Sequence, residues 1–281
     1  MIRLKKPELC QSKILDDCID NIIDSKRRQR LSNLKKEIVE LSHSYDCLAE
    51  QGKLLGIKGK EISDSYANKG DLLFLYSSKF SKKGELARQY YDKIKLSAPN
   101  GKCPQCGQQL VSTLDHYLPK SQYPLLSVVQ YNLVPCCYDC NRHKLSQSAK
   151  SHTKETMHPY YDDFDDEIWL RAAIIEGKDI AFDFYVCKPE KWSMEKFERV
   201  KNHFRVFQLN NIYKPYAAEW AVEESKSLSR LLKKTDKKTV EDDICDRMKD
   251  VQSTHKNTWK YAVYKAIFYS EWFWKEYLLM L

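Results

Sequence analysis

Groups that can bind a metal ion or move a proton gather in the 31 residues between Leu114 and Lys144. An acid and an imidazole, Asp115 and His116, stand side by side near the start of this stretch, and two cysteines, Cys137 and Cys140, lie near its end. A carboxylate beside an imidazole can hold a divalent ion or activate water, whereas paired thiolates are typical zinc ligands. We therefore expect two kinds of chemistry within one short segment.

Two cysteine pairs of the form C-x-x-C frame this segment, Cys103 with Cys106 and Cys137 with Cys140. Each pair can hold one side of a tetrahedral zinc ion, and two pairs so close together are not typical of coincidence or of a redox site. Cys136 could replace Cys137, but Cys137 restores the two-residue gap. Four thiolates leave no open coordination position, so we expect a structural zinc that stabilises a segment too small for its own core.

The composition is that of a globular protein that works outside the membrane. Hydrophobic residues make up 42% of the 281 residues and charged residues 31%, enough for a substantial core and a well-solvated surface. The net charge of +8 is compatible with a polyanionic partner without establishing one. No apolar run follows the first residues, so we expect a cytoplasmic protein with reduced cysteines. The basic runs 26–30 and 230–238 are expected to be solvated helix faces, with a grip on nucleic acid as the alternative.

The elements that would position these groups are read from hydrophobic periodicity. Residues up to 98 look helical, with one apolar stripe over 14–23 and a further helix over 83–96. Short apolar runs at 110–119 and 132–137 predict strands, and 141–148 predicts a helix directly after the second cysteine pair. Five cysteines outside the segment are expected to be buried small side chains: Cys10, Cys18, Cys47, Cys187 and Cys245.

The chain beyond residue 165 returns to helical patterns. We expect helices over 166–175, 194–209 and 216–232, a strand over 179–187, and a markedly aromatic end over 258–281. Charged residues interrupt that end, so it predicts burial or a partner rather than a membrane span. The expected fold is α+β and mainly α-helical, with a small zinc-stapled core at 99–165 between helical regions at 1–98 and 166–281.

The segment resembles the HNH endonucleases of the His-Me finger, or ββα-metal, fold. The likeness covers roughly residues 101–150, with a weaker echo after His158. It is carried by Asp115-His116 followed by Pro119, by Asn132-Leu133-Val134, and by Cys137-x-x-Cys140-Asn141-Arg142-His143-Lys144.

This resemblance implies a role for each matched residue. His116 would be the general base that takes a proton from the attacking water. Asp115 and Asn141 would hold one divalent ion against the scissile phosphate. Asn132 would brace the loop or orient His116. The expected fold of this core is therefore two strands and a helix enclosing a metal-dependent phosphodiesterase site.

The last letter of the motif departs from the commonest pattern. Many relatives have histidine directly after the final cysteine, where this chain has Asn141, with His143 two positions later. We favour Asn141, and His143 is the alternative ligand. An amide and a carboxylate are hard oxygen ligands, which favours magnesium or manganese. Arg142 and Lys144 are candidates for contacts with substrate phosphates.

The flanking regions resemble more weakly the HNH subunit, PtuB, of Septu-type antiphage defence systems. That likeness implies a DNA nuclease that acts with an ABC-type ATPase subunit, sometimes beside a retron reverse transcriptase. The chain has no G-x-x-x-x-G-K-[ST] loop, so ATP use would come from such a partner, and the aromatic C-terminal stretch is a candidate docking surface. An RNase effector, for instance against tRNA, and a non-catalytic zinc-stapled binding module are the alternatives.

Overall fold

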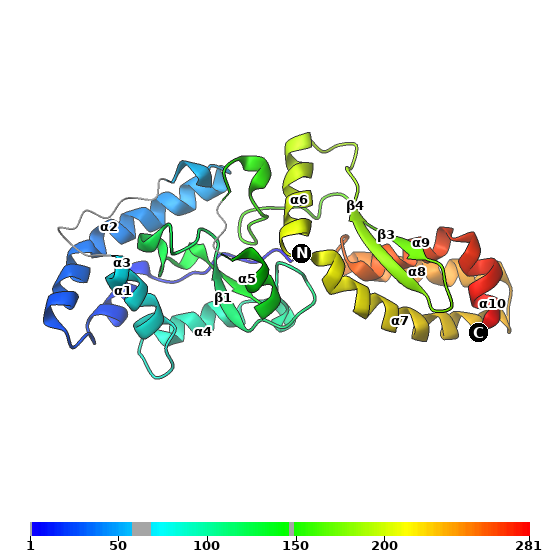
Figure 1. Ribbon diagram of the computed structural model, residues 1–281, viewed down its shortest axis with the longest axis horizontal. Helices are drawn as coiled ribbons and strands as arrows, with labels where there is room; N and C mark the ends of the chain where they lie inside the picture. Colours follow the sequence, from blue (N-terminus) through cyan, green and yellow to red (C-terminus); the bar gives the residue numbers. More distant parts are fainter. Residues whose placement is uncertain (1, 58–68, 146–148) are drawn as a thin grey trace. The chain divides into compact units, whose positions relative to one another are not determined.

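The computed structural model describes residues 2–57, 69–145 and 149–281, which form two compact units. The first unit comprises residues 2–105 and 109–162, and the second comprises residues 106–108 and 163–281 (Figure 1). Both units are mainly helical and each carries one small two-stranded sheet. The mainly helical α+β fold is thereby confirmed, while the predicted boundary at residue 98 stays a prediction.

The first unit begins with two helices where one continuous stripe was expected. Helix α1 ends before residue 20, and Asp24 caps the next helix by accepting bonds from the backbone N–H groups of Lys26 and Arg27. The stripe therefore stops at Ile22, which is buried, while Ile23 is 99% exposed and the prediction for it is wrong. The helical elements here are α1 (Gln11–Ile19), α2 (Ser25–Glu50), η1 (Leu54–Gly56), α3 (Lys69–Phe74), the π-helical η2 (Leu75–Phe80) and α4 (Arg88–Leu96).

One hydrophobic core joins these helices to the segment that carries the candidate site. Apolar side chains from α1, α2, η2 and α4 pack in one cluster with Leu114 and Leu133, so the helices form the support for a hairpin. Of the five cysteines expected to be buried, only Cys18 is; Cys10 and Cys47 are exposed and the other two are half-buried.

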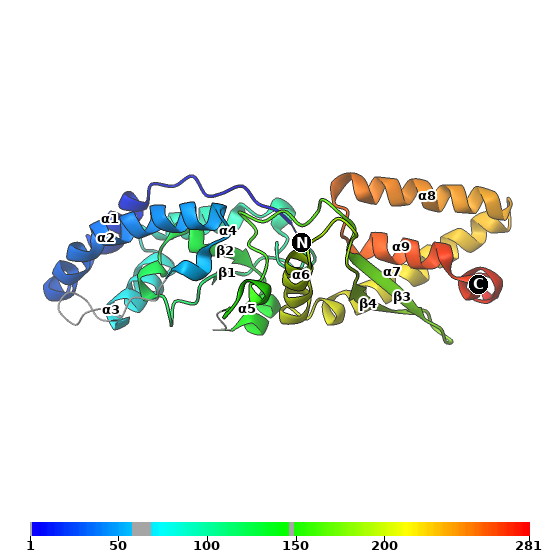
Figure 2. The same cartoon turned by 90° about the horizontal axis from the view of Figure 1, so that it is seen from above.

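The hairpin and the helix after it form a ββα unit. Strand β1 (Thr113–His116) pairs antiparallel with β2 (Leu133–Cys136), in a register that sets Asp115 opposite Val134. Helix α5 (Tyr138–Lys144) follows and packs against β1, while α4 packs against both strands (Figure 2). The helix begins three residues earlier than expected, because the Cys137 sulfur caps its start. The expected residues 146–148 lie outside the described part of the chain.

Short helical turns complete the first unit. The connection between β1 and β2 contains the turns η4 (Pro124–Leu126) and η5 (Gln130–Asn132), so the loop is folded rather than extended. Two further turns lie on either side of the ββα unit, η3 (Pro99–Gly101) and η6 (His152–Lys154).

The second unit contains a hairpin where the sequence predicted a helix followed by a strand. Strand β3 (Leu170–Ile175) pairs antiparallel with β4 (Ala181–Val186), so the helix expected over 166–175 is wrong. The run forms a strand because Ala172 and Ile174 pair with Phe184 and Phe182 of β4, and both phenylalanines are buried. The strand expected over 179–187 is confirmed as β4.

Helices surround this second hairpin. Helix α7 packs against β4 and α9 packs against β3 (Figure 2). Aromatic side chains of the C-terminal stretch, including Tyr264, Phe273 and Tyr277, are buried in this unit. Among the described residues, no helix is long and apolar enough to cross a membrane. The helices are α6 (Met194–Val206), α7 (Leu209–Leu232), α8 (Lys237–Thr254), α9 (Trp259–Tyr269), the π-helical η7 (Phe273–Tyr277) and α10 (Leu278–Met280).

Candidate functional site

The four cysteines predicted to bind zinc lie together. The sulfur atoms of Cys103, Cys106, Cys137 and Cys140 are all within 4.8 Å of one another, and all four residues are buried. A tetrahedral zinc with Zn–S bonds near 2.3 Å requires sulfur separations of about 3.8 Å, which this set can reach with small adjustments. The backbone N–H of Cys140 donates to the Cys137 sulfur at 3.4 Å, which favours the thiolate form. The donor set therefore fits a structural zinc.

Cys136 lies beside this cluster as a fifth thiol. It is buried at the end of β2, and hydrogen bonds with the thiols of Cys103 and Cys140 lower its pKa. The set of four mutually close sulfur atoms nevertheless contains Cys137 and not Cys136. The two-residue spacing thus selects the same cysteine as the geometry does.

The acid and the imidazole lie at the end of β1, and α5 reaches both of them. Asp115 is 5% exposed and His116 is 7% exposed. The Lys144 ammonium at the end of α5 lies 2.8 Å from Asp115 Oδ2 and 2.5 Å from the His116 carbonyl oxygen. Burial raises the pKa of Asp115 and the Lys144 charge opposes that rise. Lys144 therefore ties helix to strand and compensates a buried carboxyl group.

His116 is held in one tautomer by the loop between the strands. Its Nε2 lies 2.9 Å from the Ser127 carbonyl oxygen, which can only accept, so Nε2 carries the proton. The lone pair is then on Nδ1. Burial, with the positive charge of Lys120, lowers the pKa of His116 to about 3. The ring is consequently neutral at physiological pH and packs edge-on against Tyr76, with centroids 4.5 Å apart.

Two buried polar residues fix the loop that holds His116. The Asn132 amide accepts from the Leu118 backbone N–H at 2.7 Å and donates to the carbonyl oxygens of Leu118 and Leu126. Its side-chain bonds thus close the loop rather than reach His116. The Ser127 hydroxyl donates to the Leu72 carbonyl oxygen of α3 at 3.1 Å, which ties the loop to the helical support.

The orientation of α5 bears on the choice between Asn141 and His143. Lys144 faces Asp115, and Asn141 lies three residues earlier, about 60° away around the helix, whereas His143 is about 100° away. Asn141 is half-buried and Arg142 is exposed. Asn141 and His143 are both half-buried, so helical periodicity alone favours Asn141.

Two polar residues that the sequence did not single out support this site. Asp71 on α3 is 1% exposed and pairs with Arg27 and Arg30 of α2, each at 2.8 Å. The expectation of a purely solvated basic run at 26–30 is therefore wrong for these two arginines. Ser127 orients His116 through its backbone carbonyl group. Because every residue has such a group, the sequence could not identify this contact.

His158 has a structural place in the first unit. It is 2% exposed and its Nε2 lies 3.1 Å from the Tyr45 hydroxyl, with the rings of Tyr117 and Tyr161 packed against it. A buried imidazole that is hydrogen-bonded among aromatic rings stabilises the core.

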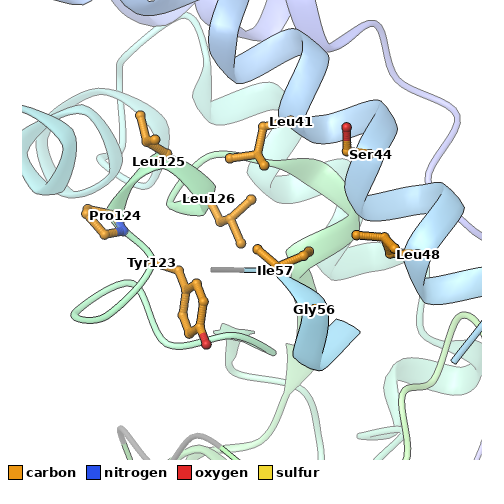
Figure 3. Close-up of a pocket in the computed structure, with 9 residues that line it drawn as sticks. All are labelled: Leu41, Ser44, Leu48, Gly56, Ile57, Tyr123, Pro124, Leu125 and Leu126. Carbon is orange, nitrogen blue, oxygen red and sulfur yellow. The ribbon is translucent and has the colours of Figure 1, made fainter. Parts of the chain in front are cut away.

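An apolar pocket of about 320 Å³ is lined in part by the loop between β1 and β2. Its walls are α2, the turn η1 and residues Tyr123–Leu126, and Figure 3 shows leucine side chains directed into it. None of the described residues that line it is charged, and this apolar lining does not suit a phosphodiester.

Comparison with known proteins agrees with a relationship to phage and defence proteins. No protein-family model matches the chain, and no solved structure matches it. Septu protein PtuB of Bacillus thuringiensis is 30% identical over 98 residues, which are 33% of this chain and 37% of PtuB. Protein ea31 of Escherichia phage lambda is 30% identical over 224 residues, which are 76% of this chain and 75% of ea31. The chain therefore belongs to the same family as the phage lambda protein ea31.

Proposed function

We propose that this protein is a metal-dependent endonuclease of the HNH type that hydrolyses phosphodiester bonds in DNA. The proposal rests above all on the contact of Lys144 with Asp115 and His116, because it brings α5, which carries Asn141, against the strand that carries the acid and the imidazole. A four-cysteine cluster at the base of the same helix supports it.

In this proposal His116 acts as the general base. With Nε2 donating to the Ser127 carbonyl, Nδ1 is the atom that accepts a proton from the attacking water. The lowered pKa keeps Nδ1 unprotonated at neutral pH, and it also makes the ring a weaker base than a histidine with an ordinary pKa. Positioned general bases contribute about 10²–10⁴-fold to rates, which sets the expected effect of removing the ring.

Asp115 and Asn141 offer the oxygen ligands for a divalent ion. A carboxylate and an amide suit magnesium or manganese, and the buried carboxylate already attracts a cation, in the form of the Lys144 ammonium. When bound, the ion would stabilise negative charge on the phosphate and on the leaving oxygen. Lys144 would then yield part of its contact with Asp115 and turn toward a phosphate, while exposed Arg142 contacts the backbone.

The biological role proposed is that of an effector in antiphage defence. The similarity to Septu protein PtuB supports this role, and it suggests an ABC-type ATPase as the partner subunit. The sequence itself has no nucleotide-binding P-loop, which fits a division of labour between two chains. A pairing with a retron reverse transcriptase has no support among the relatives found.

Incubation of the purified protein with magnesium on DNA and on RNA, with and without the partner ATPase, tests the proposal. Wild-type protein should cleave DNA, and His116→Ala should lower the rate by about 10²–10⁴-fold. His152→Ala removes an imidazole on a surface turn, paired with Glu155, and should leave the rate unchanged.

Cleavage of RNA alone, with the same dependence on His116, would favour the alternative of an RNase effector. Absence of His116-dependent cleavage of either polymer in every condition would leave the non-catalytic binding module. Asn141→Ala and His143→Ala complete the series, and loss of activity in the His143 variant only would transfer the ligand role to that residue.

A further inference from the structure

A shallow trough of about 370 Å³ lies in the second unit, between β3 and α9. Ala262, Lys265, Ala266 and Tyr269 contribute to it from one face of α9, because they are spaced by three and four residues. The strands contribute Arg171, among others. The small alanine side chains form the bottom of the trough, and the longer side chains around them form its walls.

Two cations, Arg171 and Lys265, line this trough. Among the residues that the structure describes, neither Arg171 nor Lys265 forms an ion pair, and the buried Nη1 of Arg171 has no hydrogen-bond partner. Burial, and then the charge of Arg171, lower the pKa of Lys265. Glu176 also lines the trough but pairs with neither cation. Two positive charges that line one trough, one of them a partly desolvated guanidinium, are typical of a site that binds an anion.

Aromatic rings stand beside the cations. Tyr185 lies directly opposite Arg171 in the sheet register and is 44% exposed, and Tyr269 is 72% exposed. Exposed rings next to lysine and arginine suit a strand whose phosphates meet the cations while its unpaired bases stack on the rings. A duplex would keep its bases away from both tyrosines.

We propose that this trough binds single-stranded nucleic acid, with Arg171 and Lys265 on phosphates and Tyr185 and Tyr269 on bases. The inference rests on the proposed function for the identity of the ligand as nucleic acid. It adds a second contact region, which would hold a strand independently of the chemistry at Asp115 and His116.

Fluorescence anisotropy of the full-length chain with a labelled oligothymidylate of about 16 nucleotides tests the trough. No magnesium or manganese is added, so binding is measured without cleavage. The double variant Arg171→Gln/Lys265→Gln should weaken binding at least about tenfold and reduce the dependence of log K on log salt by about 1.4, because each phosphate contact on a single strand contributes about 0.7. Lys82→Gln/Lys83→Gln removes the same charge from two adjacent exposed lysines outside the trough and outside both basic runs, and should change neither quantity.

Tyr269→Ala gives a second measurement that does not depend on the charged pair. The side chain is mostly exposed, so its loss leaves the unit folded, and it should weaken binding of the single strand roughly tenfold. Tyr269→Phe should restore the affinity, since the ring face remains.

Equal affinities of wild type and the double variant would overturn the inference. So would equally tight binding of a matched duplex, or of a polyglutamate peptide that depends on the same cations, which would indicate an acidic protein partner. Trough-dependent binding by a chain that cleaves nothing would uphold the trough and refute the nuclease. Cleavage that depends on His116 with unchanged binding in the trough variants would do the reverse.

Discussion

The buried carboxylates of the first unit and the β3–α9 trough of the second unit treat charged side chains in opposite ways, although the second unit also contains matched charges such as Glu224 with Arg247. In the first unit, buried Asp71 is paired with Arg27 and Arg30, and buried Asp115 is paired with Lys144. In the second unit, Arg171 and Lys265 line the same trough, and neither forms an ion pair with any acid in the described part of the chain, including Glu176 of the trough itself. Charges that are matched within the chain hold a structure in place, whereas unmatched ones are available to a ligand from outside.

This difference makes a prediction about the sign of mutational effects. Removing one partner from a buried pair leaves an uncompensated charge and destabilises the fold. Removing one of two repelling cations lowers the repulsion in the folded state. The change should therefore stabilise the fold and weaken only the binding of a ligand. Four experiments follow, from the largest expected effect to the smallest.

The zinc cluster should give the largest effect. Cys140→Ser removes one of four buried thiolates, and zinc sites of this kind contribute about 10–16 kcal/mol in small zinc-finger peptides at neutral pH. We expect loss of bound zinc and unfolding of the ββα unit at room temperature, measured by metal analysis and circular dichroism. Cys47→Ser, at an exposed cysteine, should change neither. A zinc-free protein with unchanged melting would show that the cluster is not structural.

Lys144→Met should come next, because it leaves Asp115 buried without its cation. Breaking a buried pair on one side costs about 3–5 kcal/mol. Thermal unfolding should show this loss, and added magnesium should recover more stability in the variant than in wild type, since the ion can replace the ammonium. Lys150→Met, at an exposed lysine, is the matched control. Equal magnesium responses would mean that the ion does not bind Asp115.

Asp71→Asn should have a smaller effect of the same sign. Its partners Arg27 and Arg30 are about one-third exposed, so water can solvate them once the carboxylate is gone. We expect a loss of about 1–3 kcal/mol in chemical denaturation, mostly from the buried hydrogen bonds. Asp20→Asn, at an exposed position in the same unit, should be neutral. A loss as large as that of Lys144→Met would show that partner exposure does not matter here.

Lys265→Gln should have the smallest effect and the opposite sign. Surface substitutions are usually worth within about 0.5 kcal/mol, and relief of the repulsion by Arg171 should make this one stabilising. The lowered pKa means that the unfolded chain binds more protons just below the ordinary lysine pKa, so wild-type stability rises with pH there. The gain of the variant should therefore shrink as the pH approaches that value. Destabilisation by Lys265→Gln but not by Lys233→Gln would contradict the claim that Lys265 is held near Arg171 without a counter-ion.

Local patterns predicted the parts of the fold that depend on short spacings. The C-x-x-C pairs identified the four clustered cysteines, and the apolar runs around Asp115 and Val134 predicted β1 and β2. The run over 166–175 was misassigned because a short apolar segment fits a helix or a strand equally well, and only its pairing with Phe182 and Phe184 decides.

Contacts between distant residues were beyond reach of the sequence. The motif suggested that Lys144 meets a phosphate, yet its ammonium lies on Asp115, 29 positions earlier in the chain. The pairing of Asp71 with two arginines more than 40 positions away is of the same kind. Such contacts are set by how the elements pack, and residue types alone do not encode them.

Crystals soaked in manganese offer the most direct test of the central claim, that one divalent ion is held by the acid at the end of β1 and the amide on α5. Apart from the zinc of the four-cysteine cluster, anomalous diffraction at the manganese edge should show one peak within about 2.3 Å of an Asp115 carboxylate oxygen and the Asn141 amide oxygen, with Lys144 displaced. A peak on His143 in place of Asn141, or no peak with Lys144 still paired to Asp115, would contradict it.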